Sequence, residues 1–133
     1  MRDYPVGRIM TANPATVGPQ DSVVEAQRRL DNHFIHHLPV VEDGRLVGMV
    51  SSSDLLKLHL LDDNLTLRLQ ATVEQIMETN VVVIDRKATL RDAAEKLCMG
   101  GFHALPVVDK HKRLVGIVTS SDLIGELLEH LPA

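Results

Sequence analysis

The chain has 133 residues and a mass of 14.7 kDa, enough for one ordinary domain with an apolar core. Hydrophobic residues make up 44% of it and charged residues 24%, and no apolar run approaches the roughly 20 residues of a membrane span. A single cysteine, Cys98, excludes an internal disulfide framework and a cysteine-based zinc site. Aromatic residues make up 2% and the net charge is −4, which weighs against nucleic-acid binding, because that needs aromatic platforms and a basic face.

The first half of the chain predicts a short helix, a strand, a helix, a hairpin and a second helix. Pro5 suits the first turn of the short helix, and Ser22-x-x-Glu25 is a capping box that begins the next one. Asp43-Gly44 predicts the turn of the hairpin, and Ser53 or Asp54 caps a leucine-rich helix. The expected segments are 5–10, 15–17, 22–30, 38–41 with 46–50, and 53–61.

The second half predicts the same order of elements. Thr72-x-x-Gln75 caps the first short helix, and Thr89 caps a helix with apolar residues on one face. The expected strands are 81–84, 103–108 and 113–119, and the last helix runs from near Ser121 to Leu131. Cys98 lies on the apolar face of its helix, which indicates packing rather than a reactive thiol.

These two halves are copies of one unit. Ile-Met at 9–10 and His-x-Leu-Pro-Val-Val at 36–41 recur 67 residues later. Arg-Leu-Val-Gly-x-Val at 45–50 and Ser-Ser-Asp-Leu at 52–55 recur 68 residues later, since the second turn carries one extra residue. The sequence therefore predicts two β-α-β-β-α repeats, 1–66 and 67–133, joined around 62–72. Because sixty-odd residues make a marginal core, we expect the repeats to pack into one compact pseudo-twofold module.

The repeated pattern resembles a known family. Leu-Pro-Val-Val-acidic, Leu-Val-Gly-x-Val and Ser/Thr-x-x-Asp-Leu, in this order and twice, are similar to a pair of cystathionine β-synthase (CBS) domains, called a Bateman module. The resemblance runs from about Val6 to Leu128. It implies an α/β (α+β) fold of two CBS repeats and two clefts between them. It also implies that the clefts bind adenosine-type ligands: AMP, ADP or ATP, S-adenosylmethionine or NAD. No cofactor is required.

A polar cluster stands at equivalent places in both repeats, where a strand meets a helix. A carboxylate there, Asp54 or Asp122, can accept both hydroxyls of a ribose. Neighbouring hydroxyls and helix N-terminal amides can cradle a phosphate. By resemblance, the aspartate takes the ribose and the Ser/Thr pair takes the phosphate. The alternative is helix capping, which can coexist with ligand binding. The hydroxyl residues concerned are Ser51, Ser53, Thr119 and Ser121.

Two histidines, His36 and His103, precede the Leu-Pro-Val-Val strand of each repeat. In some nucleotide-binding relatives a basic residue here contacts phosphate, and the alternative is a solvent-facing histidine. His33 is replaced by Gly100 in the second copy, so we expect no metal site. The base would lie in a largely aliphatic slot, in clefts that need not be equivalent. The remaining candidate ligand-binding residues are Thr16, Ile35, His37, Met49, Val83, Phe102, Ala104 and Ile117.

No catalytic constellation is present, so the sequence predicts a regulatory module rather than an enzyme. The leucine-rich helices carry more apolar residues than one small sheet covers, which predicts a homodimer. A second hypothesis is a constitutive dimerisation scaffold with vestigial clefts, and a third is a divalent-ion or nucleic-acid ligand. The lone cysteine, the absence of a targeting segment and the pI near 5.9 predict a cytoplasmic protein. The chain ends favour a complete small protein.

Overall fold

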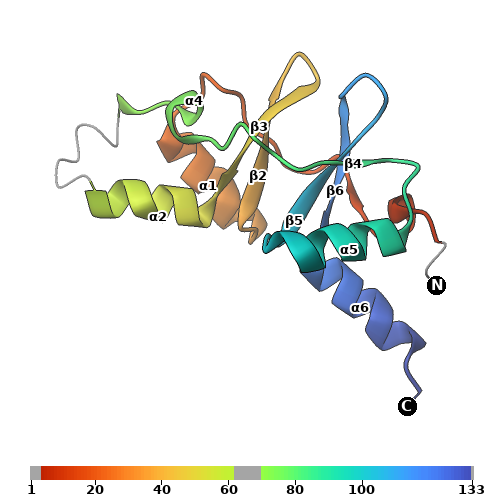
Figure 1. Ribbon diagram of the computed structural model, residues 1–133. Coiled ribbons are helices and arrows are strands. Elements are labelled where there is room, and N and C mark those ends of the chain that lie inside the picture. Colours follow the sequence, from red (N-terminus) through yellow and green to blue (C-terminus); the bar gives the residue numbers. More distant parts are fainter. Residues whose placement is uncertain (1–3, 62–69, 133) are drawn as a thin grey trace. The chain divides into compact units, whose positions relative to one another are not determined.

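We describe the fold from a computed structural model, which places residues 4–61 and 70–132 (Figure 1). The chain divides into two compact units. We call them the first-repeat unit, Ala15–Val81, and the second-repeat unit, Met1–Pro14 with Val82–Ala133. Most of the predicted linker, 62–72, lies outside the described residues.

The first-repeat unit is built around the antiparallel hairpin of β2 and β3. The pairing runs from His37 opposite Ser51 to Glu42 opposite Arg45. Single bridges extend it on both sides: Val17 pairs in parallel with β2, and Glu78 pairs antiparallel with β3. The elements are α1 (Val23–His33), β2 (His37–Glu42), β3 (Arg45–Ser51), α2 (Ser52–Leu61) and α4 (Val73–Ile76).

The second-repeat unit has the same plan, with its outer pairings extended into strands. Its sheet has the order β1-β6-β5-β4, with β4 parallel to β5 and the other neighbours antiparallel. The mixture of helices and a mainly antiparallel sheet confirms the predicted α+β class. The elements are η1 (Val6–Arg8), β1 (Thr11–Ala12), β4 (Ile84–Asp85), α5 (Leu90–Gly100), β5 (Ala104–Val108), β6 (Leu114–Thr119) and α6 (Ser120–His130).

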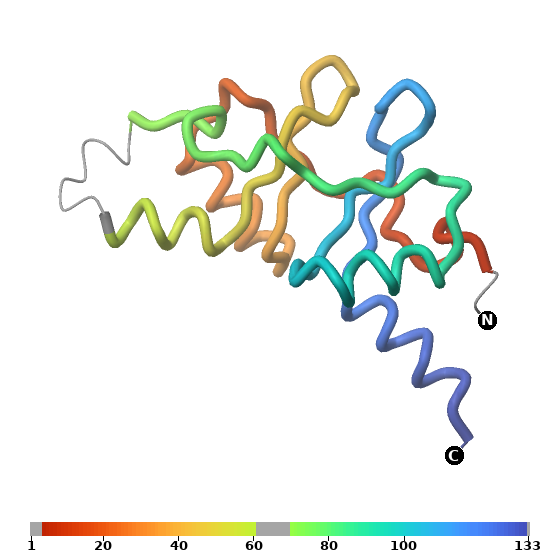
Figure 2. The backbone as a smooth tube through the Cα atoms, viewed as in Figure 1, coloured from red at the N-terminus to blue at the C-terminus, as the bar shows by residue number. Residues whose placement is uncertain are grey.

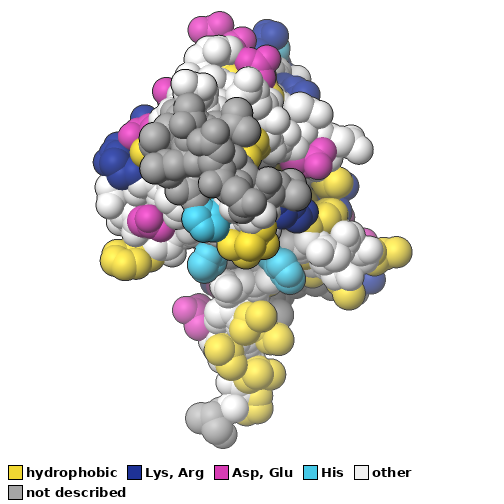
Figure 3. Space-filling view, turned by 90° about the vertical axis from the view of Figure 1, so that its left-hand side faces the viewer, with side chains coloured by type: hydrophobic (Ala, Val, Ile, Leu, Met, Phe, Trp, Pro, Cys, Tyr) yellow, Lys and Arg dark blue, Asp and Glu magenta, His cyan; other side chains and the backbone are white. Residues whose placement is uncertain are grey.

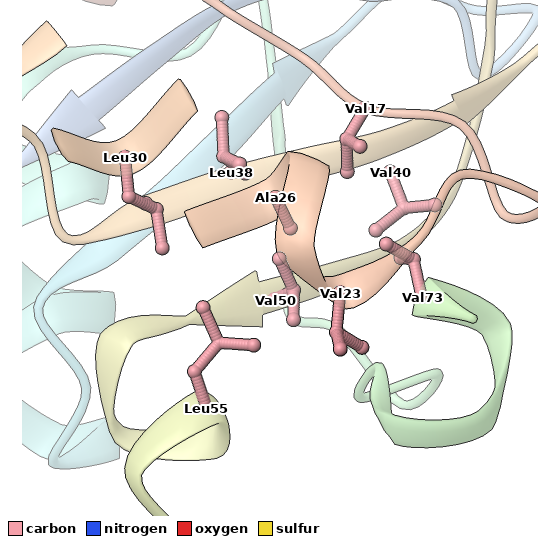
Figure 4. Packing of buried hydrophobic residues seen from close by; sticks show 9 residues of the cluster. All are labelled: Val17, Val23, Ala26, Leu30, Leu38, Val40, Val50, Leu55 and Val73. Carbon is pink, nitrogen blue, oxygen red and sulfur yellow. The ribbon is translucent and has the colours of Figure 1, made fainter. Parts of the chain in front are cut away.

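Each unit has its own apolar core, formed by helix residues at i, i+3 and i+7 spacing that face buried strand residues. In α1 these are Val23, Ala26 and Leu30, and Figure 4 shows them pointing toward the side chains of the hairpin. Their partners in that cluster are Val17, Leu38, Val40, Val50, Leu55 and Val73. The second-repeat unit buries Val6, Ile84, Ala93, Leu97, Leu105, Val107 and Val118.

The two units exchange their first segments. The segment at 4–14 precedes the first repeat in sequence, yet its strand β1 pairs with β6 of the second repeat, as the path of the chain shows (Figure 2). The equivalent segment at 70–81 folds with the first repeat, where Glu78 and Met49 exchange backbone hydrogen bonds of 2.8 and 2.9 Å. The compact units therefore have other boundaries than the sequence repeats 1–66 and 67–133.

A polar cluster ties the end of α6 to the exchanged N-terminal segment. The carboxylate of Glu126 lies 3.3 Å from Nε of Arg8 and 3.2 Å from Nε2 of His130. The guanidinium of Arg8 stacks 4.0 Å over the ring of Tyr4. No residue of α6 is buried, so these contacts help to hold its last turns against the N-terminal segment.

The predicted helix caps are confirmed for three helices: Ser22 accepts from the amide of Glu25, Thr89 forms a capping box with Asp92, and Thr72 forms one with Gln75. Several predicted boundaries are wrong. The strand at 15–17 is a single bridge at Val17, because Pro14 and Pro19 on either side lack an amide for a ladder. The strand at 81–84 reduces to Ile84–Asp85. The leucine-rich helix begins at Ser52, since Ser51 supplies the cap.

Candidate functional site

The junction of β3 and α2 is closed by a reciprocal pair of hydrogen bonds. Oδ2 of Asp54 accepts from the amide of Ser51 at 2.8 Å and from its hydroxyl at 3.0 Å. Oγ of Ser51 in turn accepts from the amide of Asp54 at 3.2 Å. This is a capping box with an aspartate at the third helical position, and it fixes the carboxylate at the start of α2.

The junction of β6 and α6 repeats this geometry. Oδ2 of Asp122 accepts from the amide of Thr119 at 2.8 Å, and Oγ1 of Thr119 accepts from the amide of Asp122 at 3.2 Å. A threonine thus replaces the serine and keeps both reciprocal bonds to backbone amides, while the bond from the Ser51 hydroxyl to Asp54 has no counterpart at Thr119 within the described residues. The aspartates and their hydroxyl partners are half-buried at both junctions.

Both aspartates therefore take part in helix capping, and the cap occupies only one carboxylate oxygen of each. Within 4–61 and 70–132, Oδ1 of Asp54 and Oδ1 of Asp122 accept no hydrogen bond. Across the same residues, the amides of Ser53 and Ser121 donate no hydrogen bond, whereas the amides on either side of them donate to the capping hydroxyls and to the carbonyls of residues 36 and 103. Each junction therefore presents one anionic acceptor, one amide donor and one exposed hydroxyl.

The candidate histidines lie at these junctions. The carbonyl of His36 accepts from the amide of Ser52 at 2.9 Å, and Nδ1 of His36 lies 3.5 Å from Oγ of Ser52. The carbonyl of His103 accepts from the amide of Ser120 at 3.0 Å. Both side chains are exposed. The structure thus brings His36 together with the first junction and His103 together with the second.

The candidate set divides evenly, with one residue of each equivalent pair in each unit. The residues at 49, 104 and 117 are nearly buried, with exposures of 8%, 7% and 8%. Those at 35 and 102 pack against the edges of the two cores. The first-repeat unit holds Thr16, Ile35, His36, His37, Met49, Ser51, Ser53 and Asp54. The second-repeat unit holds Val83, Phe102, His103, Ala104, Ile117, Thr119, Ser121 and Asp122.

An open groove of about 700 Å³ in the second-repeat unit brings two of the candidates together. Val83 and Phe102 line it, together with charged residues of α5 such as Asp92 and Lys96. The ring of Phe102 lies against Gly100, where a side chain would collide with it. The glycine at the end of α5 is therefore required for the position of the ring.

The structure shows a contact between an arginine side chain and the backbone of Thr16 that the sequence did not predict. Nη1 of Arg29 donates to the carbonyl of Thr16 at 2.6 Å, and Nε donates to Glu25 at 2.8 Å. Hydrogen bonds from Arg28 and then Arg29 lower the pKa of Glu25 from 4.5 to about 2. The four-residue spacing of Glu25 and Arg29 indicates a helical ion pair, but it does not predict that Arg29 also binds the carbonyl of Thr16.

No group of three or more His, Cys, Asp or Glu side chains that could hold a metal ion occurs in the described part of the chain. His33, His36 and His37 form no such group. Across the same residues, no helix has the length and apolar character needed to cross a membrane.

The sequence model of the CBS domain matches residues 6–60 and 73–129. The chain belongs to the CBS domain family. The two matched ranges hold both capping junctions and confirm the predicted tandem repeat.

Solved CBS pairs share this fold over nearly their whole length. The structure of CBSX2 in complex with AMP is 34% identical, has a TM-score of 0.83, and aligns over 95% of this chain and 97% of that one. CBSX2 is a protein of Arabidopsis thaliana. The CBS domain pair of protein MJ0100 in complex with 5′-methylthioadenosine and S-adenosyl-L-methionine is 34% identical, with a TM-score of 0.81 over 93% of this chain and 98% of that one.

Among curated relatives, the CBS domain-containing protein DDB_G0289609 of Dictyostelium discoideum is 33% identical and matches 95% of this chain and 92% of its own length. Other relatives are longer: the chain matches 21% of the L-aspartate semialdehyde sulfurtransferase of Methanocaldococcus jannaschii, at 36% identity. This CBS pair thus spans less than half the length of five of the curated relatives that it matches.

Proposed function

We propose that this CBS pair is a ligand-sensing regulatory module that binds an adenosine-type ligand at its two capping junctions. The observation that carries the proposal is the unused oxygen, Oδ1, of Asp54 and of Asp122, each fixed by a capping box. A preoriented carboxylate oxygen is a strong acceptor for a ribose hydroxyl, because its hydrogen bond is charge-assisted. The complexes of CBSX2 with AMP and of the MJ0100 pair with S-adenosyl-L-methionine support this ligand class.

In the proposed complex, the donors at each junction bind the group attached to the ribose. The hydroxyl and amide of Ser53, and those of Ser121, would donate to a phosphate of AMP, ADP or ATP. Ser51 and Thr119 play a supporting part, because their hydroxyls are committed to the helix caps. His36 and His103 are exposed at the junctions, where their rings would add further hydrogen-bond donors to the phosphate.

Sites of this kind regulate by shifting populations. A ligand changes the balance of two conformations only if it binds one of them more tightly. We therefore assign the module the role of converting ligand occupancy into a change of shape or of association. The chemical activities named for the longer relatives belong to proteins of which this chain matches 21% to 24%, and we propose no catalysis for it.

We further propose that the module forms a homodimer through its leucine-rich helices. Helix α6 exposes apolar side chains along its length, which Figure 3 shows gathered toward the lower end of the view. A groove of about 340 Å³ between α5 and α6 is lined almost wholly by apolar atoms. Side chains of this kind are seldom left in water over a contiguous area. Those of α6 are Ile124, Leu127 and Leu128, and exposed Leu131 follows directly after the helix.

The scaffold hypothesis remains the second candidate, favoured by one observation. The capping boxes account for Ser51, Asp54, Thr119 and Asp122 without any ligand. A dimerisation scaffold would need these residues for helix stability alone.

A thermal-shift panel with AMP, ADP, ATP, S-adenosylmethionine, NAD and a single-stranded oligonucleotide tests the proposal. A ligand at 100 times its Kd stabilises the folded state by about 2.7 kcal/mol, or several degrees. Asp54→Asn keeps a carbonyl oxygen for the cap while removing the charge, and Asp122→Asn is its counterpart. We expect each variant to lose part of the response. A panel in which no adenosine ligand raises the Tm would contradict the proposal and favour the scaffold hypothesis.

A further inference from the structure

Phe34 occupies a backbone conformation that is unusual for its residue type. It follows α1 with φ 54° and ψ 43°, the left-handed region, and its amide donates to the carbonyl of Asp31 at 3.3 Å. Glycine is the usual residue at such a helix end, because a side chain is strained there. The other non-glycine residues of the described chain with positive φ are Asn13, Asp43 and Lys112.

The second repeat shows the unstrained alternative. The position equivalent to Phe34 is Gly101, which ends α5 with φ 70°. The strain at Phe34 is not offset by burial, since its side chain is 93% exposed. Phe102, the other phenylalanine of the chain, packs against its own core. The first repeat therefore keeps an aromatic ring in water at a site where glycine would fold more easily.

Phe34 stands two residues before His36, whose backbone binds the first capping junction. Ile35, the next residue, donates from its amide to the carbonyl of Leu30 and so fixes the turn after α1. His36 then binds the amide of Ser52 through its carbonyl at 2.9 Å. Because two residues span at most about 7 Å, the α-carbon of Phe34 lies close to that of His36. The exposed side chain therefore starts near the junction formed by Ser53 and Asp54.

An exposed aromatic ring offers one kind of interaction that the rest of the site lacks. Flat heteroaromatic bases stack on aromatic faces, and each such contact contributes measurably to affinity. The other candidate apolar residues of the first-repeat unit, Ile35 and Met49, are aliphatic and partly or wholly packed in that unit. We propose that Phe34 is a specificity-determining residue that stacks on the purine base of the ligand at the first capping junction. The inference rests on the proposed function and extends it to the base.

The two repeats differ at this position. Gly101 offers no ring, and no atom lies within 4 Å of a Cβ built on it. The first junction should therefore bind a purine nucleoside more tightly than the second, although both keep the same carboxylate and hydroxyl pattern.

A tryptophan reporter tests the stacking directly, because the chain has no tryptophan of its own. In the full-length Phe34→Trp protein, we expect AMP to quench the indole emission with the same Kd that calorimetry gives. Glu42→Trp is the matched control: residue 42 is exposed in the same unit, at the opposite end of the hairpin from the junction. Its emission should not change. Binding of AMP by calorimetry without quenching at residue 34 would overturn the proposal.

Phe34→Gly tests whether loss of the ring weakens ligand binding without destabilising the fold. Because it removes the strain, we expect a Tm that is no lower than that of the wild type, together with roughly five- to tenfold weaker binding of AMP and S-adenosylmethionine at one site. Unchanged affinity would overturn the proposed stacking. If the oligomeric mass also fell, the ring would instead pack against a second copy of the chain. A wild-type protein that binds neither ligand would overturn the proposed function itself.

Discussion

Gly116 lies directly against Met10, so that a Cβ added to Gly116 would be 2.5 Å from the sulfur of Met10 and 2.9 Å from the carbonyl oxygen of Thr11. Gly48 has the same relationship to Met77 and to the carbonyl of Glu78, at 2.7 and 3.0 Å. These two glycines are the points at which the exchanged segments pass over the hairpins of the two units. The exchange therefore depends on the absence of a side chain at two positions.

Gly116→Ala should destabilise the protein by about 1–3 kcal/mol, because the new methyl group must displace both a side chain and a backbone carbonyl. Chemical denaturation measures the change. Gly125→Ala is the control, since a Cβ there meets no atom within 4 Å and alanine favours the helix. Adding Met10→Ala should recover only part of the loss, as the carbonyl of Thr11 remains. Equal stabilities for the Gly116 and Gly125 variants would contradict the close packing of the N-terminal segment.

Replacing Ser51 should change folding stability, whereas replacing Ser53 should change the affinity for the ligand. Ser51→Ala removes the cap of α2 and should cost about 0.5–2 kcal/mol of folding stability. Ser53→Ala removes an exposed hydroxyl and should leave the Tm within about a degree, while weakening the binding of AMP. Thermal unfolding and calorimetry on both variants check this. An unchanged AMP affinity in the Ser53 variant would remove that hydroxyl from the proposed phosphate contact.

The ion-pair cluster of Glu25 predicts a loss of stability in acid. Hydrogen bonds from Arg28 and Arg29 lower the pKa of Glu25 to about 2 in the folded state, against 4.5 ordinarily. A carboxylate with a lowered folded-state pKa stabilises the protein above its ordinary pKa, and this stabilisation is lost as the pH falls from about 4.5 toward 2. Urea unfolding at pH 6 and pH 3 should show a larger drop for the wild type than for Glu25→Gln. Parallel losses in both proteins would count against the cluster.

Replacing His36 and His103 should weaken the binding of phosphate-bearing ligands. Both side chains are exposed at the capping junctions, where a ring N–H can donate to a phosphate oxygen. ATP should bind less tightly to His36→Asn with His103→Asn than to the wild type, whereas adenosine should bind equally to both. Calorimetry on the two proteins measures the difference. An equal affinity for ATP in both proteins would exclude the histidines from the phosphate contact.

Replacing Leu128 on α6 should disrupt the proposed homodimer. Leu128 is 65% exposed, and Leu128→Glu would place a charge within the apolar face without disturbing the core. Sedimentation should then give the mass of one chain instead of two. Val82→Glu, at an exposed apolar residue outside the leucine-rich helices, is the control and should stay dimeric. A wild type that sediments as a single chain at high concentration would refute the dimer.

Much of the local structure follows from short-range patterns. The caps at Ser22, Thr72 and Thr89 act over three residues, and the helical spacing of Val23, Ala26 and Leu30 places them on one buried face. The repeat predicts the second half once the first is known. The candidate aspartates are recognisable for the same reason, since a hydroxyl three residues before an aspartate is a local capping pattern.

The exchange of segments, and which polar atoms are left without a hydrogen bond at the junctions, depend on contacts that no local pattern encodes. Thr11 pairs with Ile117, more than a hundred residues away, and that pairing requires the bare backbone face of Gly116. Arg29 reaches Thr16 because the loop before α1 folds back along it. The sequence alone predicts most helix caps, the hairpins and the inward-facing residues, because those features depend on short-range spacing. Folding in three dimensions brings distant segments together, and it leaves one oxygen of Asp54 and of Asp122 available to a ligand.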